Sequence, residues 1–404
     1  MSEMDFARTM RRSEGYGGCD DEMAKRVYIG VGGKARKVKK IYIGVAGVAR
    51  KVKKAYIGVG GVARIFWSGG ELEYYGTATA LSSGRTYHAA ATVGNYALFG
   101  GGYSYSSGYM TTVDAYSASL IRSTPTALSE ARYDLAGVAV GSYALFGGGG
   151  NSSTYGASTV VDAYNTSLTR STPTALSESR NNLGAATIGN YALFAGGHEG
   201  NSSSAGYFAT VDAYNTSLTR SAPTALSIAR YYLASATVGN YALFIGGYYY
   251  DGEDRMSSTR IDVYNTSLTR STMTADQHCF GNAAASVGNY ILYVKNNVAG
   301  SVVATINASL TKGTAASLSN ARYNLAAMTL GEYALFGGGQ SSSSSYSAVV
   351  DSYDTSLTMA VATSLSLARK CPACAQVGNY GLFAGGDTGS SSSSYKNVVD
   401  VYTI

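Results

Sequence analysis

A repeat of about 47 residues is the feature that most constrains how this chain can fold. In each copy an aliphatic residue, a glycine and a polar residue precede a tyrosine. Successive glycines are separated by 47, 48, 50, 49, 43 and 47 residues, and this regularity indicates stacked copies of one supersecondary unit. The glycines are Gly94, Gly141, Gly189, Gly239, Gly288, Gly331 and Gly378.

Each repeat contains four short segments that are typical of antiparallel strands. A run of small apolar residues, such as 89–93, meets a Gly-Asn pair, which has the composition of a two-residue hairpin turn. Tyr-Ala-Leu-Phe follows at 96–99, and Val-Asp-Ala-Tyr at 113–116 reads as a third strand. A fourth segment, such as 169–176, leads into the next repeat. Four strands per repeat predict one propeller blade, so we expect an all-β, seven-bladed β-propeller over residues 68–404.

The repeats resemble the Kelch repeat at three places. A double glycine follows the second strand, a Val-Asp-x-Tyr segment forms the third, and an arginine precedes the turn glycine by nine residues. The resemblance covers residues 71–404 and implies a Kelch-like propeller. The sequence departs from the Kelch pattern because it lacks the tryptophan that is usual in the fourth strand. The fifth repeat departs most, because Val294-Lys295 stand in place of the glycines and Cys279 in place of the arginine.

The recurring arginine and aspartate are interpreted as structural. An arginine between the fourth strand and the next first strand can bond carbonyls of neighbouring blades, although a direct role in ligand binding stays open. An acid that occurs in six copies is not expected to be a catalytic residue. The arginines are Arg85, Arg132, Arg180, Arg230, Arg322 and Arg369, and the aspartates are Asp114, Asp162, Asp212, Asp262, Asp351 and Asp400.

The two ends of the propeller region predict how its ring closes. The last repeat ends at 399–404, which reads as a third strand with no fourth strand after it. Residues 71–81 read as a fourth strand that has no blade of its own. Pairing these segments would complete the seventh blade and remove exposed strand edges. The alternatives are an open ring or a ring of six blades.

A second repeat, 14 residues long, lies before the propeller. Tyr-Ile-Gly-Val recurs three times between glycine turns, and residues 25–64 contain twelve Lys and Arg and no acid. Glycines at short intervals and many β-branched residues favour a β-meander over a helix. We expect 1–24 to be an extension and 25–67 to be a basic arm that docks on a protein partner or on copies of itself. Nucleic acid is a less favoured partner for these cations. The candidate docking residues are Tyr28, Arg36, Lys37, Lys39, Lys40, Tyr42, Arg50, Lys51, Lys53, Lys54, Tyr56 and Arg64.

No constellation of residues points to catalysis. The three histidines fall in different repeats without a metal-ligand spacing, and no nucleophile elbow or phosphate-binding loop is recognisable. Cys371 and Cys374 form a C-x-x-C pair with no second pair to complete a zinc site. We therefore expect no enzyme activity, no metal and no cofactor.

The loops between second and third strands vary and are rich in Tyr and Ser, on an otherwise uniform scaffold. Tyr and Ser are the residues of adaptable binding surfaces, and they would suit a glycan or a protein. The alternative is that they are merely tolerated loop tips. The candidate ligand-binding residues are Tyr103, Tyr105, Tyr109, Tyr155, His198, Tyr207, Tyr248, Tyr249, Tyr250, Asp251, Tyr346 and Tyr395.

The arm and the Ser/Tyr-rich propeller together resemble virion proteins of bacteriophages, through the basic repeats of residues 25–67. The resemblance implies a multi-copy protein that docks on other virion proteins and displays the propeller to the host surface. The N-terminus lacks an apolar leader and no stretch is long enough to span a membrane, so we expect synthesis in the host cytoplasm and assembly into a virion. A purely structural decoration protein, an intracellular Kelch scaffold and a carbohydrate-active propeller enzyme stay as alternatives.

Overall fold

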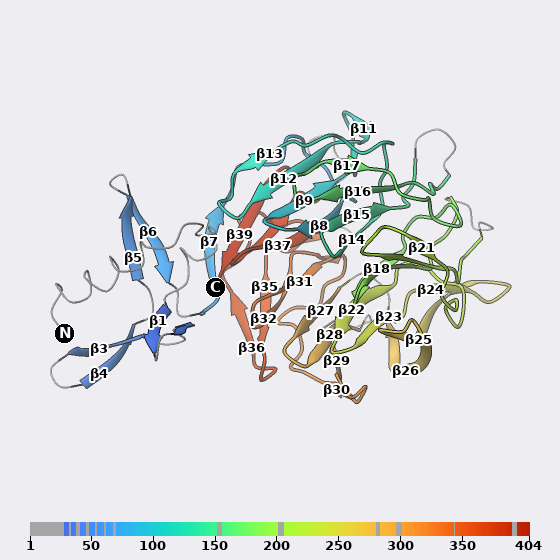
Figure 1. Ribbon diagram of the computed structural model, residues 1–404. Coiled ribbons are helices and arrows are strands. Elements are labelled where there is room, and N and C mark those ends of the chain that lie inside the picture. Colours follow the sequence, from blue (N-terminus) through green and yellow to red (C-terminus); the bar gives the residue numbers. More distant parts are fainter. Residues whose placement is uncertain are drawn as a thin grey trace. The chain divides into compact units, whose positions relative to one another are not determined.

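The structure is a computed structural model that describes residues 70–151, 156–200, 206–279, 283–295, 301–342, 344–389 and 394–404, together with six short strands before residue 68. The described residues form strands and turns, and none belongs to a helix that is long and apolar enough to cross a membrane. The chain divides into two compact units, residues 1–72 and residues 73–403. The second unit is a seven-bladed β-propeller (Figure 1), which confirms the expected fold class.

The blades follow one another along the chain, and the four strands of each run from the central channel outward. Blade 1 consists of β8 (Ala89–Val93), β9 (Tyr96–Gly100), β12 (Val113–Ser117) and β13 (Arg122–Ser123). Blade 2 consists of β14 (Ala136–Val140), β15 (Tyr143–Gly147), β16 (Val161–Asn165) and β17 (Arg170–Ser171). Blade 3 consists of β18 (Gly184–Ile188), β19 (Tyr191–Ala195), β20 (Val211–Asn215) and β21 (Arg220–Ser221). Blade 4 consists of β22 (Ala234–Val238), β23 (Tyr241–Ile245), β25 (Arg255–Asn265) and β26 (Arg270–Cys279).

The remaining blades complete the ring. Blade 5 consists of β27 (Ala284–Val287), β28 (Tyr290–Val294), β29 (Val303–Asn307) and β30 (Lys312–Thr314). Blade 6 consists of β31 (Ala326–Leu330), β32 (Tyr333–Gly337), β35 (Val350–Asp354) and β36 (Met359–Ala362). Blade 7 consists of β37 (Ala373–Val377), β38 (Tyr380–Ala384), β39 (Val399–Thr403) and β7 (Glu73–Thr77). Short strands β10 (Tyr103–Ser104), β11 (Gly108–Tyr109), β24 (Tyr248–Tyr250), β33 (Gln340–Ser342) and β34 (Ser345–Tyr346) lie in the loops after the second strands.

The ring closes as the ends of the sequence predicted. β7 pairs antiparallel with β39, and Tyr402 lies opposite Tyr74 in the ladder. The Tyr74 hydroxyl donates to the Asp400 carboxylate at 2.7 Å, and the amide of Leu81 donates to the carbonyl of Asn397 at 2.8 Å. The innermost strands of successive blades are neighbours around the channel, including β37 and β8. The N-terminal strand therefore completes the last blade.

Apolar packing joins each blade to the next. Clusters of buried residues span neighbouring blades, so Phe146 and Tyr164 of blade 2 pack with Leu98 and Val113 of blade 1. The innermost strands are also joined by hydroxyl groups. Thr187 donates to the carbonyl of Ala139, Thr237 to that of Thr187, and Ser286 to that of Thr237. These bonds run from blade to blade, so the wall of the channel is held rigid.

The outermost strands of most blades are shorter than the sequence predicted. β13, β17 and β21 contain two residues each, because Pro125, Pro173 and Pro223 follow and lack the amide that a ladder needs. Blade 4 has Met273 at this position, and β26 continues to Cys279. Proline therefore accounts for the three shortest outer strands, whereas β30 and β36 end after three and four residues without a proline.

Six blades contain a buried ion pair between the recurring arginine and aspartate. In blade 3, Arg180 donates to the Asp212 carboxylate at 2.6 Å and to the carbonyl of Phe194 at 3.2 Å. The side chains of both residues are 0% exposed. Arg220 of the outermost strand binds the other carboxylate oxygen at 2.6 Å. The structural interpretation of these residues is confirmed.

The arginine side chains bind within their own blade, which corrects the expectation that they bond carbonyls of neighbouring blades. The link between blades comes from the arginine backbone instead. The amide of Gly149 in blade 2 donates to the carbonyl of Arg180 in blade 3 at 3.0 Å. The adjacent Gly148 has φ +66°, and a Cβ there would lie 2.5 Å from the same carbonyl oxygen. The double glycine is therefore required by this close approach.

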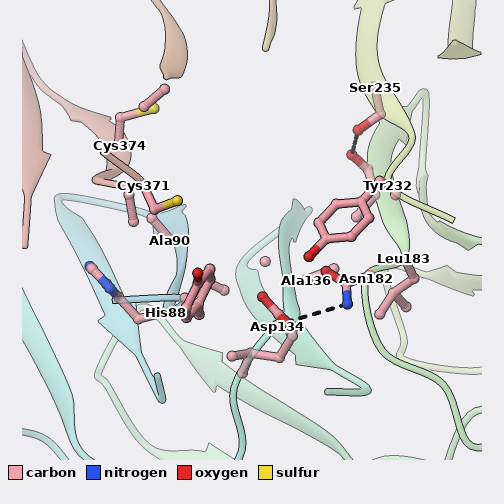
Figure 2. Close-up of a pocket in the computed structure, with 18 of the residues that line it drawn as sticks. His88, Ala90, Asp134, Ala136, Asn182, Leu183, Tyr232, Ser235, Cys371 and Cys374 are labelled. Atoms are coloured by element: carbon pink, nitrogen blue, oxygen red, sulfur yellow. Dashed lines mark hydrogen bonds between the residues drawn. The ribbon is translucent and has the colours of Figure 1, made fainter. Parts of the chain in front are cut away.

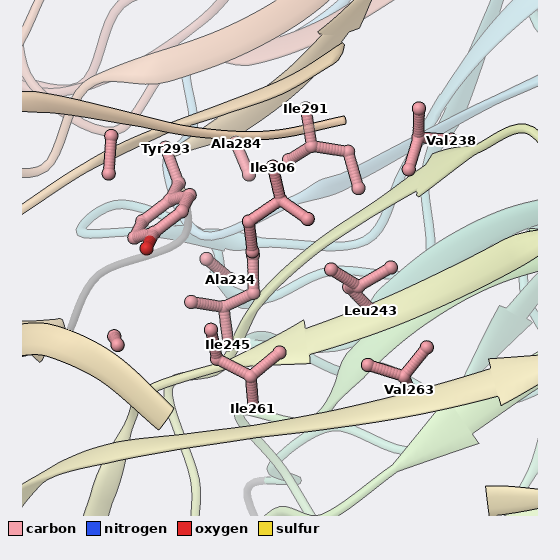
Figure 3. Packing of buried hydrophobic residues seen from close by; sticks show 12 residues of the cluster. Ala234, Val238, Leu243, Ile245, Ile261, Val263, Ala284, Ile291, Tyr293 and Ile306 are labelled. Carbon is pink, nitrogen blue, oxygen red and sulfur yellow. The ribbon is translucent and has the colours of Figure 1, made fainter. Parts of the chain in front are cut away.

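Blade 5 replaces the ion pair with apolar residues. Cys279 stands in place of the arginine, and in the β29 register Ala304 and Ile306 stand in place of the aspartate and tyrosine. Figure 3 shows Ile306 and Tyr293 packed with Ile245 and Ile261 of blade 4. Both members of the ion pair are replaced together, so neither is left buried without the other. The expectation that this blade departs from the repeat is confirmed.

The first unit contains three two-stranded hairpins, each described by its backbone. β1 (Tyr28–Val31) pairs with β2 (Lys34–Lys37), β3 (Ile41–Val45) with β4 (Val48–Val52), and β5 (Ala55–Val59) with β6 (Val62–Trp67). The expected Gly-Gly and Ala-Gly turns, at 32–33, 46–47 and 60–61, lie outside the described residues. Among the described strands of this unit, each pairs only with the other strand of its own hairpin. Runs of like charge separate successive hairpins and oppose the close pairing of a longer sheet.

Candidate functional site

A ring of residues in the left-handed conformation surrounds one mouth of the channel. In six blades the second residue after the buried arginine has φ between +48° and +56°. The backbone links these positions, because the amide of Asp134 donates to the carbonyl of Tyr87 at 2.9 Å and that of Asn182 to Asp134 at 3.0 Å. Left-handed Tyr and Cys are uncommon, and such backbone strain often marks a functional site. The channel ring consists of Tyr87, Asp134, Asn182, Tyr232, Asn324 and Cys371.

The channel ring opens onto a cavity of about 370 Å³. Below the ring its wall is made of small residues, such as Ala90, Gly137 and Ala185, which leave the channel open. Figure 2 shows the Asp134 carboxylate and the Tyr232 hydroxyl pointing toward one another. A cavity of this size accepts a small ligand or the end group of a larger one.

Asp134 is the carboxylate of this cavity. Asn182 donates to it at 3.3 Å. Burial raises its pKa to about 7, and the bond from Asn182 opposes that shift. Burial, followed by the Asp134 carboxylate, also raises the pKa of Tyr232. The cavity thus holds a carboxyl group that exchanges its proton near neutral pH among neutral hydrogen-bonding groups.

The two cysteines both line the cavity. Cys371 lies in the channel ring before β37, and Cys374 lies inside that strand. Burial raises the pKa of each thiol to about 12. The thiols therefore stay protonated at neutral pH and are poor nucleophiles and metal ligands.

A second set of variable positions lies outside the channel ring. The residue directly after each buried arginine forms a β-bridge with the residue directly after the double glycine. These bridges anchor the loops between second and third strands beside the channel mouth, so the loops and the ring share one face. The bridged pairs are Thr86–Tyr103, Tyr133–Gly150, Asn181–His198, Tyr231–Tyr248, Tyr323–Gln340 and Lys370–Asp387.

An aromatic cluster covers this face over blades 3 and 4. The rings of Tyr207 and Tyr231 are stacked, with centroids 5.1 Å apart and planes inclined by 2°. His198 lies 4.5 Å and Tyr248 5.7 Å from the Tyr231 ring. Arg255 lies 4.6 Å above the Tyr248 ring and donates to the Tyr231 hydroxyl at 3.3 Å. We call these five residues the blade 3–4 cluster.

The blade 3–4 cluster is continuous with the channel ring. The Tyr231 ring lies 5.1 Å from the ring of Tyr232, and the Asn182 amide is 3.3 Å from the His198 imidazole. Tyr250, 46% exposed, extends the cluster outward from Tyr207 at 6.3 Å. Aromatic rings therefore lead from the outer loops to the cavity.

The other predicted ligand-binding residues occupy several places. Tyr103 lies 5.4 Å from Tyr109 and 5.7 Å from Tyr395, which brings blades 1 and 7 together on the same face. Tyr105 is 63% exposed, and Tyr346 lies 5.8 Å from the Lys370 ammonium.

Two further predicted residues, Tyr249 and Asp251, lie in the β24–β25 hairpin beside Tyr248 and Tyr250. Tyr249 pairs with Met256, and Asp251 accepts the amides of Glu253 and Asp254, so its carboxylate stabilises the hairpin turn. Tyr155, Lys39, Lys40, Lys53 and Lys54 lie outside the described residues, as do the side chains of the other docking-arm residues.

The residues that follow the buried arginines, including Tyr87, Asp134, Tyr231 and Tyr232, were not predicted from the sequence. A signal was present, because these positions vary between repeats while the arginine before them does not. They were overlooked because they precede a uniform strand instead of lying in a long loop.

His88 occupies a position that is leucine in four other blades, and it is 7% exposed. Burial, followed by the charge of Arg85, lowers the pKa of His88 well below its usual value. Unfolding would release this histidine to its ordinary pKa of about 6.5. The unfolded chain therefore binds a proton that the folded chain rejects, and stability falls as the pH drops below about 6.5.

We expect His88→Leu to make the propeller less sensitive to acid. Between pH 8 and pH 5 the wild type should lose up to about 2 kcal/mol of stability through this residue, a loss that the variant avoids. Urea unfolding of both proteins at the two pH values measures the effect. An equal loss in both proteins would show that His88 does not contribute.

Among the residues that the structure describes, no group of three or more His, Cys, Asp or Glu could hold a metal ion. Models of known protein families give no match to this sequence, and none of the curated proteins compared with it matches.

Proposed function

We propose that this chain is a non-enzymatic binding protein whose propeller recognises a glycan through the face that carries the channel ring and the blade 3–4 cluster. The observation that carries the proposal is the stacked pair Tyr207–Tyr231, which is linked through Tyr232 to a cavity. Flat aromatic surfaces beside Asn and Asp side chains suit sugars, which present both apolar faces and hydroxyl groups.

The distribution of variation between blades supports a binding role. Every blade faces the same packing problem, and the buried Arg, Asp and Tyr positions are filled alike in six of them. Positions on the face that carries the channel ring and the blade 3–4 cluster differ from blade to blade. The channel ring alone contains Tyr, Asp, Asn and Cys. A rigid scaffold that carries varied side chains on one face is the arrangement of a recognition surface.

The wider assignment is to a bacteriophage particle, where the basic arm docks on other virion proteins and the Kelch-like propeller is displayed to the host surface. It is supported by the 14-residue basic repeats, whose twelve cations suit an acidic protein surface. A large host glycan would meet many copies of a weak site, which compensates for modest affinity at each.

A glycan array with the full-length protein tests the propeller part of the proposal. We expect binding to a limited set of glycans, reduced at least about tenfold by the double substitution Tyr207→Ala and Tyr250→Ala, because stacking on aromatic rings contributes about 1 kcal/mol or more per ring. Binding that survives this substitution would place the ligand elsewhere.

A matched control for this experiment lies in the turns between third and fourth strands. Ile121 is 68% exposed, and the corresponding residue is threonine in five other blades, among them Thr169 and Thr219. Ile121→Thr should leave glycan binding unchanged. A protein that binds no glycan on the array would contradict the proposed function.

A further inference from the structure

We infer that the cavity inside the channel ring is a subsite for a sugar residue with a free amino group, whose ammonium is bound by the Asp134 carboxylate. This inference rests on the proposed function, because it names the chemical class of the glycan. It goes further in assigning a charged anchor and a place for the end of the ligand.

The charges around the cavity favour a cationic ligand. Asp134 lines the cavity, and no lysine or arginine is among the lining residues. The buried aspartates of the propeller are paired with arginine or lysine, as Asp212 is with Arg180 at 2.6 Å, whereas Asp134 is partly exposed to the cavity. Across the described residues, Asp134 makes no ion pair. A ligand cation is therefore the group that complements this cavity.

The state of the carboxyl group supports the same conclusion. Burial raises the pKa of Asp134 to about 7, and the hydrogen bond from Asn182 opposes this shift. An ammonium group beside it would restore the ordinary preference for the ionised form. The carboxylate would then gain a charge-assisted hydrogen bond in addition to the bond from Asn182.

The neutral groups of the ring suit the rest of a sugar. Tyr87 and Tyr232 provide aromatic surface for the ring and for the ammonium, which is attracted to aromatic faces. Asn182 and Asn324 provide amide donors and acceptors for hydroxyl groups. The cavity volume of about 370 Å³ accepts one sugar residue and excludes a bulky folded segment.

The channel ring is continuous with the blade 3–4 cluster, and this favours a sugar chain over a single sugar as the ligand. Tyr232 in the ring contacts Tyr231, which is stacked on Tyr207 farther out. A glycan whose terminal amino sugar occupies the cavity can therefore continue across these rings. The site is built to hold the end of a chain.

The test compares two ligands that differ only at nitrogen: a glucosamine trisaccharide and its fully N-acetylated counterpart. Titration calorimetry with the full-length protein at pH 7.5 should show at least about tenfold tighter binding of the free-amine form. Asp134→Asn keeps the size of the side chain and should remove this preference, leaving the two ligands within about twofold of each other.

The control substitution is Asp354→Asn. Asp354 accepts two backbone amides in the turn of blade 6, where four other blades have asparagine, among them Asn165 and Asn215. This variant should keep the wild-type preference for the free amine, so a loss specific to Asp134→Asn is attributable to the cavity.

The outcomes separate this inference from the proposed function. Equal binding of both trisaccharides, or an unchanged preference in Asp134→Asn, would overturn the inference. Binding of a lysine-rich peptide that competes with the free-amine sugar and is tighter would also overturn it. In any of these cases, array binding that depends on Tyr207 and Tyr250 would leave the proposed function standing.

Discussion

Replacing Arg322 by methionine is expected to destabilise the propeller by about 3–5 kcal/mol, because it leaves a buried carboxylate without its cation. Arg322 binds the Asp351 carboxylate at 2.7 Å, and the side chains of both residues are 0% exposed. In blade 6 the outermost strand has Met359 where four other blades have a second arginine. Urea denaturation followed by far-ultraviolet circular dichroism measures the loss.

Two comparison variants sharpen this prediction. Arg180→Met should cost less, because Asp212 keeps a second arginine, Arg220, at 2.6 Å. The double variant Arg322→Met, Asp351→Ala should recover part of the loss, because it removes the isolated charge. A double variant as unstable as Arg322→Met alone would show that shape, and not charge, governs the position.

Deleting residues 1–81 is expected to prevent the propeller from folding stably. The deletion removes β7, exposes the edge of β39, and takes away the 2%-exposed Leu81 and the bond from Tyr74 to Asp400. Loss of Leu81 burial costs about 2 kcal/mol, and loss of the hydrogen bond from Tyr74 costs about 1 kcal/mol more, since Asp400 keeps its ion pair with Arg369 at 2.7 Å. Adding the lost ladder, the total approaches the whole stability of an ordinary domain.

The matched control is deletion of residues 1–69, which keeps β7. This shorter deletion should give a soluble monomer that unfolds at nearly the same temperature as the full-length chain, as measured by calorimetry. If the longer deletion also unfolds at that temperature, the closing strand does not govern the stability of the propeller.

Much of the fold could be predicted from the sequence because every blade pairs and buries its strands through nearly the same residue pattern. The repeat length, the strand pattern and the recurring arginine and aspartate positions change little between repeats, and the closing strand follows from where the last repeat ends. The ion pair between Arg180 and Asp212 was found only in the structure. The ends of the outer strands were less predictable. Their lengths depend on single residues, such as Pro173 in blade 2 and Met273 in blade 4.

The candidate site was predicted only in part. The loop residues His198, Tyr207 and Tyr248 were recognised as variable and aromatic, but nothing in the sequence indicated that they share a cluster with Tyr231. Tyr207 and Tyr231 belong to different blades and stack because the ring of blades brings their loops side by side. Asp134 and Asn182, which are 48 residues apart, likewise come together only through the ring of blades.

The sequence by itself determined the scaffold: seven blades, closure by an N-terminal strand, and buried side chains that repeat with the period of the chain. These features depend on local pairing and on burial, which each repeat encodes independently. Only the tertiary structure decided the site, because curvature around the channel axis converts equivalent positions of different blades into neighbours. A left-handed backbone then holds Asp134 and Tyr232 at one cavity, where the Asp134 carboxylate makes no ion pair with any residue that the structure describes. No single repeat contains this arrangement.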